Sequence, residues 1–185
     1  MRKLILAAAL ALTALSAGAA TVAGVKIEDT SSVNGQNLVL NGAGLRKKFV
    51  IKVYVGALYL PGKQSNAAAI LAADAPRRMV MHFLYDVDKE KMAEAWQEGL
   101  EDNTPNASAE VKTAFKTLST WMADMKEGQR IVLTYAPGTG TTVEVAGANK
   151  GTLGGKAVAD AILNTWVGPK PAPGGDFKKA ILGQK

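Results

Sequence analysis

The sequence predicts an α+β fold built around an antiparallel sheet. Stretches of alternating apolar and polar residues, typical of strands, follow one another directly along much of the chain. Alanine-rich or amphipathic stretches, typical of helices, cluster separately. The expected order is strand, strand, strand, helix, strand, helix, helix, strand, strand, helix, helix. Locally paired strands with clustered helices indicate an α+β fold rather than a parallel α/β fold.

The N-terminus has the pattern of a secretory signal peptide. Arg2 and Lys3 precede an apolar run over 4–15, and small residues follow. The run is shorter than the roughly 20 residues that a membrane-spanning helix needs. We therefore expect residues 1–20 to be a cleaved signal peptide, with an uncleaved anchor as the alternative. Residues 21–185 are expected to form a single domain, located in the periplasm and without a stable membrane anchor.

Composition excludes several classes of chemistry. The 185 residues include no cysteine, which excludes disulfides, zinc fingers and thiol nucleophiles. His82 is the sole histidine, so no two-histidine metal motif exists. The net charge of +6 is mild and the basic residues do not cluster as nucleic-acid binding requires. The sequence therefore predicts no metal site, no cofactor and no nucleic-acid partner.

The N-terminal part of the domain contains two short strand candidates. Residues 21–35 are polar and carry turn formers, with a short strand expected at 25–28. A second strand is expected at 36–40. The Asn-Gly-Ala-Gly run at 41–44 is expected to close it as a turn.

Residues 49–60 give the strongest strand signal. Every second residue from Phe49 is apolar or aromatic, and the other face is mixed. A long strand of this kind fits an antiparallel sheet. Lys52 and Tyr54 fall on the mixed face, so we expect both side chains to point to the same side.

One helix, one strand and two further helices follow. Residues 65–73 are alanine-rich, with Ser65 or Asn66 as the expected N-cap. A strand is expected at 78–85, and helices at 88–101 and 107–125. Their apolar stripes, rich in Met and aromatic residues, are interpreted as core packing.

The C-terminal part predicts a hairpin and two helices. Strands at 129–135 and 141–146 flank a Pro-Gly-Thr-Gly tip. Residues 147–155 are expected to be a turn-rich link. Helices are expected at 156–166 and 176–182.

Arg46 is the first candidate binding residue. It follows the expected turn at 41–44, and Lys47 and Lys48 come directly after it. From the pattern alone, a solvated basic turn explains this cluster better than a binding site does.

Two motifs resemble the chalcone isomerase family. The first is Leu-Asn-Gly-Ala-Gly-Leu-Arg at 40–46, followed by the Tyr-Leu-terminated strand at 49–60. The second is Val-Glu-Val-Ala-Gly at 143–147, an Asn-Lys pair, and the helix Lys-Ala-Val-Ala-Asp-Ala-Ile-Leu at 156–163. Their order and spacing resemble those of the family. The signal peptide suggests its bacterial exported, chalcone isomerase-like branch.

The resemblance implies an open-faced β-sandwich, with helices packed on one face of the sheet and a cleft between them. It implies that Arg46 binds an anionic group of the ligand and that Lys91 matches a family lysine. Tyr54 stands where the enzymes have a water-positioning Thr. Three further enzyme positions, a Tyr, an Asn and a Ser/Thr, are changed here to Asp88, Ala95 and Ala161. We therefore predict no catalytic residues.

Non-catalytic, fatty-acid-binding members of the family resemble this chain in pairing the Arg with a Tyr. Arg46 and Tyr54 are therefore expected to anchor a ligand, with Lys52 and Lys91 adding positive potential. The predicted function is an exported, non-catalytic protein that binds a small amphipathic anion, a fatty acid or a phenolic. An isomerase or intramolecular lyase on an unknown substrate, and an envelope protein-interaction module, are the alternatives.

Overall fold

The computed structural model describes residues 20–184, so the expected signal peptide lies outside the described residues except for Ala20. The strands are β1 (Ala20–Val22), β2 (Val25–Ile27), β3 (Thr30–Val33), β4 (Gln36–Lys48), β5 (Ile51–Leu60), β6 (Arg77–Phe83), β7 (Arg130–Ala136), β8 (Gly140–Val145) and β9 (Ala148–Leu153). The helices are α1 (Ala67–Ala72), α2 (Lys89–Asn103), α3 (Ala109–Thr120), α4 (Lys156–Val167) and α5 (Gly175–Ile181).

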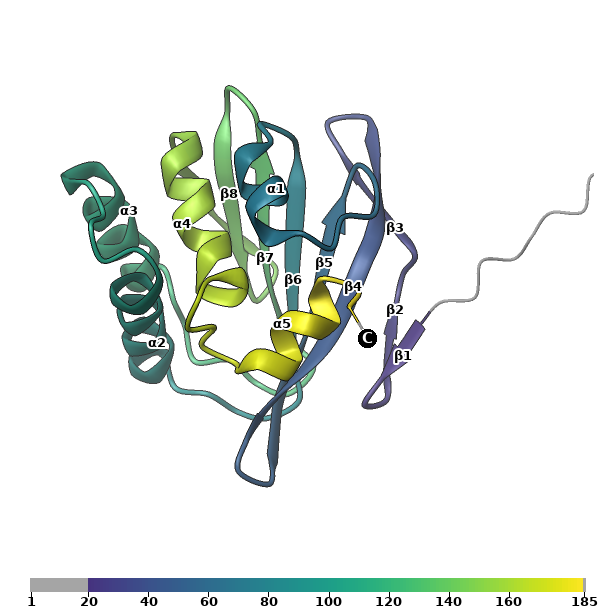
Figure 1. The fold of residues 1–185 in the computed structure, drawn as a ribbon. Helices are drawn as coiled ribbons and strands as arrows, with labels where there is room; N and C mark the ends of the chain where they lie inside the picture. The colour runs from purple at the N-terminus through teal and green to yellow at the C-terminus, as the bar shows by residue number, and fades with distance from the viewer. Residues whose placement is uncertain (1–19, 185) are drawn as a thin grey trace, which may run out of the picture.

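One antiparallel sheet organises the domain. Its seven strands, β3 to β9, lie side by side in chain order, and each is antiparallel to the next. Figure 1 shows the helices gathered on one side of this sheet. The α+β fold with an antiparallel sheet is therefore confirmed. Within residues 20–184, no helix combines the length and apolar character needed to cross a bilayer.

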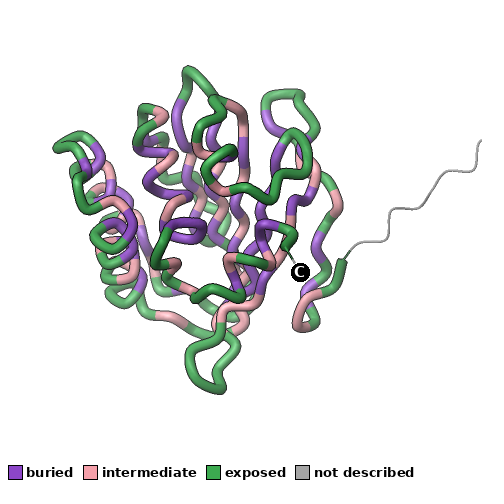
Figure 2. The backbone as a smooth tube through the Cα atoms, in the orientation of Figure 1, coloured by how far each residue is buried: buried purple, intermediate pink, exposed green. Residues whose placement is uncertain are grey.

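The sheet buries apolar side chains on both faces. Between sheet and helices lies the larger core, in which Phe83, Phe115 and Leu118 are fully buried. A smaller core on the opposite face contains Leu38 and Val55 and lies beneath the β1–β2 ribbon. Figure 2 shows the buried segments running between the layers. The central strands are therefore covered twice, which explains why β5 is apolar on both sides.

The turn expected at 41–44 is wrong, because β4 runs straight through it. The glycines there allow close packing instead. A β-carbon at Gly42 would lie 2.1 Å from the carbonyl oxygen of Ala180 in α5, and one at Gly44 would crowd Phe177. The Asn41 side chain donates to the Ile181 carbonyl at 2.8 Å. These residues form a platform for α5, and the chain turns later, after Lys48.

Three other expectations are corrected. The polar stretch before 35 contains β3, and the expected link at 147–155 contains the edge strand β9. The helix expected at 107–125 ends at Thr120 as α3. Beyond it, Met125 exchanges backbone hydrogen bonds with Val87 at 2.8–2.9 Å and so forms an isolated β-bridge instead of a last turn of helix.

A β-bulge changes the alternation along β5. Arg46 lies opposite Tyr54, but the next pair is Lys47 with Lys52, so Val53 has no partner across the ladder. Residues opposite each other in an antiparallel pair share a face. Arg46 and Tyr54 therefore share the helix-side face, and Lys47 and Lys52 share the other. The expectation that Lys52 points with Tyr54 is wrong for this reason.

Candidate ligand-binding cleft

A cleft of about 490 Å³ opens between the sheet and the helices. Ligand pockets in proteins typically measure roughly 300–1,000 Å³. Its walls come from the β4–β5 hairpin, the end of β6, α2, α4 and the segment after α4. Its buried floor is formed by Tyr54, Met81, Met92, Trp96 and Trp166. The cleft between sheet and helices that the resemblance implied is therefore present.

Arg46 lines this cleft from β4. Its Nη1 donates to the backbone carbonyl of Ala172 at 2.5 Å. A guanidinium carries five N–H donors, so one carbonyl leaves most of them uncommitted. No salt bridge found among residues 20–184 involves Arg46. The contact with Ala172 therefore orients the side chain while leaving its charge for an external anion.

Tyr54 lies directly across the ladder from Arg46 and is 5% exposed. Its hydroxyl accepts a hydrogen bond from Nε1 of Trp166 at 3.0 Å. An indole N–H can only donate, so the tyrosine proton is left for another acceptor. Burial raises the pKa of Tyr54 to about 12, although the charge of Arg46 and the Trp166 hydrogen bond oppose the shift. The phenol is therefore a neutral donor at ordinary pH.

Aromatic contacts fix the floor of the cleft. The rings of Trp96 and Trp166 meet edge to face, with centroids 5.3 Å apart, and Tyr54 meets Phe177 in the same way at 5.7 Å. Trp96 Nε1 also contacts Met122 Sδ at 3.2 Å. These packed rings give the cleft a firm apolar base.

Lys91 lies at the rim rather than in the floor. Its Nζ pairs with Asp88 Oδ2 at 3.0 Å, and its side chain is 69% exposed. The hydrogen bond to Asp88 raises the pKa of Lys91. Glu94 and Glu98 line the same rim from α2. Lys91 can reach a bound anion, but neighbouring carboxylates weaken its potential there.

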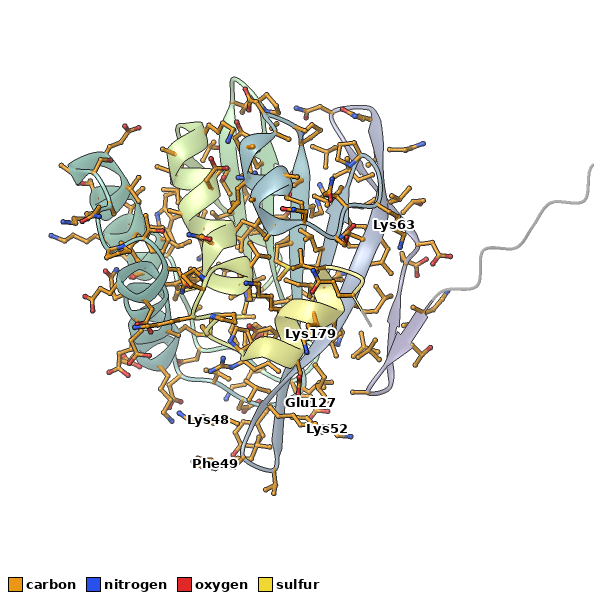
Figure 3. The ribbon with its side chains drawn as sticks, in the orientation of Figure 1. Lys48, Phe49, Lys52, Lys63, Glu127 and Lys179 are labelled. Carbon is orange, nitrogen blue, oxygen red and sulfur yellow. The ribbon has the colours of Figure 1, made fainter. Side chains whose placement is uncertain are left out.

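The structure does not bring Lys52 into the cleft. It is exposed, and Figure 3 shows its side chain directed away from that of Lys48. Lys48, which pairs with Ile51 across the hairpin, lines the cleft instead. Because of the bulge at Val53, Lys48 occupies the cleft side of the hairpin where Lys52 was expected. Alternation counted along β5 alone could not reveal this, because the extra residue is visible only in the register with β4.

The positions expected to differ from the enzymes are only partly in the cleft. Ala95 lines it, whereas Ala161 lies in the core among other α4 residues. Thr165, one helical turn after Ala161, lines the cleft and was not among the residues that the sequence predicted there. Its hydroxyl donates to the Ile162 carbonyl at 2.8 Å, so it is already engaged.

The sole histidine, His82, lies away from the cleft. It pairs across the ladder with Val55, whose side chain belongs to the core on the opposite sheet face.

Together, these features define an open-faced β-sandwich in which Arg46 and the Tyr54 hydroxyl line a largely apolar cleft. The profile of the family described as chalcone isomerase-like matches residues 19–183. The chain therefore belongs to the chalcone isomerase-like family, and the resemblance found in the sequence is confirmed.

A solved structure with the same fold is the fatty-acid binding protein of Arabidopsis thaliana. It superposes with a TM-score of 0.66 at 18% identity, covering 86% of this chain and 92% of that one. At this identity the likeness establishes the fold alone. Among curated protein sequences, nothing matches the chain.

Proposed function

We propose that this protein is an exported, non-catalytic carrier for a small amphipathic carboxylate, with a fatty acid as the first ligand to test. One observation carries the proposal: Arg46 and Tyr54 stand opposite each other on neighbouring strands, at the apolar floor of an open cleft. Both side chains keep hydrogen-bond donors that a carboxylate can accept. The fatty-acid binding protein of the same fold supports this choice of ligand.

The ligand is proposed to lie with its head at Arg46 and its tail among apolar side chains. A charge-assisted hydrogen bond contributes roughly 1.5–3 kcal/mol net. Each methylene removed from water adds about 0.8 kcal/mol. Met81, Met92 and Trp96 offer the apolar surface for that tail. The head group is therefore worth about two to four buried methylenes, and a longer tail contributes more than the head, which favours a long chain over a short acid.

The cleft gives little support to proton-transfer chemistry. Efficient acid–base catalysis needs a group whose pKa lies near the working pH. The pKa of Tyr54 is raised to about 12 and that of Lys91 is also raised, so both hold their protons. Thr165 is bonded to the backbone of its own helix. A binding role is therefore preferred to an isomerase or lyase.

The test replaces the anchor and compares an acid with its neutral analogue. Calorimetric titration with dodecanoate and with dodecanol should show that wild type prefers the acid. Arg46→Ala should weaken dodecanoate binding by roughly 10- to 150-fold and leave dodecanol binding nearly unchanged. Lys112→Ala, an exposed cation on α3, serves as the matched charge control. Equal affinity of wild type for acid and alcohol would reject the carboxylate anchor.

Export is part of the same proposal and rests on the N-terminal pattern. The protein is proposed to belong to the bacterial exported branch and to act in the periplasm after removal of the signal peptide. Intact-mass measurement of protein recovered from the periplasm should show a new N-terminus close to Ala20. A full-length mass would contradict it.

A further inference from the structure

The tip of the β4–β5 hairpin exposes large apolar side chains. We call residues 47–52 the hairpin tip. Within it, Phe49 is 90% exposed and Val50 is 94% exposed. Figure 1 shows this hairpin projecting beyond the body of the molecule, and Figure 3 shows Phe49 at its end. Such exposure of two adjacent apolar residues on a protruding loop calls for a reason outside the fold.

The tip is also unfavourable for folding in two other ways. Phe49 has a φ of 56°, in the left-handed region that bulky residues avoid. Lys47 and Lys52 stand directly opposite each other, and like charges in that position are destabilising. Backbone strain of this kind is typical of functional segments. Three costs within six residues indicate that the tip serves a contact rather than stability.

The charge of the hairpin tip indicates which kind of partner it can contact. Lys47, Lys48 and Lys52 surround the two apolar residues, and all three are exposed. None of them takes part in a salt bridge among residues 20–184. An apolar point within a ring of unpaired lysines is complementary to a layered surface, with acyl chains below and anionic groups above.

We propose that the hairpin tip docks reversibly on an anionic phospholipid bilayer. Phe49 and Val50 enter the boundary between headgroups and acyl chains, while the lysines contact lipid phosphates. A protein partner fits less well, because a stable protein interface buries about 800 Å² on each side. Two side chains on a narrow loop provide far less. A bilayer needs only a few inserted side chains together with several cations.

Docking also places the cleft beside the membrane, and this part rests on the proposed function. Phe49 and Ile51 of the tip line the cleft, together with Tyr85, which is half exposed at the end of β6. A carboxylate lipid leaving the bilayer therefore meets apolar side chains from the membrane surface to the cleft. The tip and the anchor would act in one transfer step.

The test measures sedimentation with sucrose-loaded vesicles. Vesicles of phosphatidylcholine with about 30% phosphatidylglycerol should bind wild type, and pure phosphatidylcholine should bind it much less. Lys47→Gln combined with Lys52→Gln should lower partitioning roughly 30-fold at low salt. Val50→Ser should lower it roughly tenfold. None of these three residues lines the cleft, so dodecanoate binding in solution should stay unchanged.

Controls keep this proposal separate from the ligand proposal. Lys112→Gln combined with Lys116→Gln removes the same charge from α3 and should change partitioning by less than about threefold. Failure of wild type to sediment with anionic vesicles, or tip variants that sediment like wild type, would overturn the proposal. Light scattering that shows a dimer lost in Val50→Ser would assign the tip to self-association instead. If wild type sediments with anionic vesicles but does not bind dodecanoate, the carrier function is rejected and membrane docking is retained.

Discussion

Two arginines on the helix side of the sheet have opposite surroundings. Arg77, at the start of β6, is 5% exposed and its Nη2 binds Asp160 Oδ1 at 2.6 Å. Its guanidinium also lies 4.8 Å from the ring centre of Tyr135. Arg46 contacts one carbonyl and faces an open cleft. The first cation is committed to the fold, whereas the second has its charge available.

Trp166 separates the surroundings of Arg46 from those of Arg77. Trp166 lines both the cleft and a small cavity of about 20 Å³ beside Arg77. On one side its indole meets Tyr54; on the other, α4 supplies Asp160 as the counter-ion. The comparison shows that a carboxylate from a neighbouring helix commits Arg77 to the fold, whereas α4 provides no such carboxylate to Arg46.

The largest expected effect separates the two arginines by stability. Arg77→Ala removes a buried side chain and one of the two cations that pair with Asp160, the other being Lys156 at 2.6 Å, so the free energy of unfolding should fall by about 2–3 kcal/mol. Arg46→Ala should lower it by less than about 1 kcal/mol. Urea denaturation followed by circular dichroism measures both. Replacing Arg77 with Met instead should recover part of this loss, because Met refills the space and Lys156 still pairs with Asp160. If Arg77→Ala and Arg46→Ala both lower the free energy of unfolding by less than about 1 kcal/mol, the two arginines do not differ in their contribution to the fold.

A smaller effect concerns the phenol beside Arg46. The native pKa of Tyr54 is raised from 10.0 to about 12, so above pH 10 the unfolded state loses this proton first. Stability should therefore be independent of this group below pH 10 and fall as pH rises towards 12, by up to about 2.5 kcal/mol. Tyr54→Phe should lack this component. Denaturation of both proteins at pH 8 to 11.5 gives the difference, and a constant gap across that range would contradict the burial of the phenol.

The smallest effect is expected at the rim. Lys91 is mostly exposed and paired with Asp88, so Lys91→Gln should weaken dodecanoate binding by less than about threefold. The same calorimetric titration used for Arg46→Ala measures it, and added salt should reduce the effect further. A loss of affinity as large as that of Arg46→Ala would show that the carboxylate binds at the rim, beside Lys91, as much as at Arg46.

The sequence predicted the parts of this fold that depend on local patterns. Helices α2 and α4 and the strands around β6 to β8 lie close to their expected positions, because their apolar residues keep the helical or strand period. The position of Arg46 beside Tyr54 followed from the family resemblance, and the register of β4 and β5 provides it. Whether these residues bind a ligand stays a prediction.

What the sequence could not provide depends on contacts between distant segments. Gly42 and Gly44 are turn formers in isolation and become strand residues because α5 packs on them. The bulge at Val53 turns Lys52 away from the cleft. It exists only in the pairing of β5 with β4, so the sequence of β5 alone could not predict it. The sequence could not assign Thr165 to the cleft, because whether an inward residue of α4 meets the cleft or the core depends on how α2 and the sheet pack around that helix.

The platform on β4 also has a consequence for the order in which the molecule is completed. Its cover, α5, follows every strand of the sheet in the chain, as does the Ala172 carbonyl that holds Arg46. Until that segment emerges, the backbone at Gly42 lies bare and Arg46 has no fixed orientation. A nascent chain can pair its strands early, but the packing on β4 and the cleft beside Arg46 are completed in the same step, once residues 172–181 have emerged.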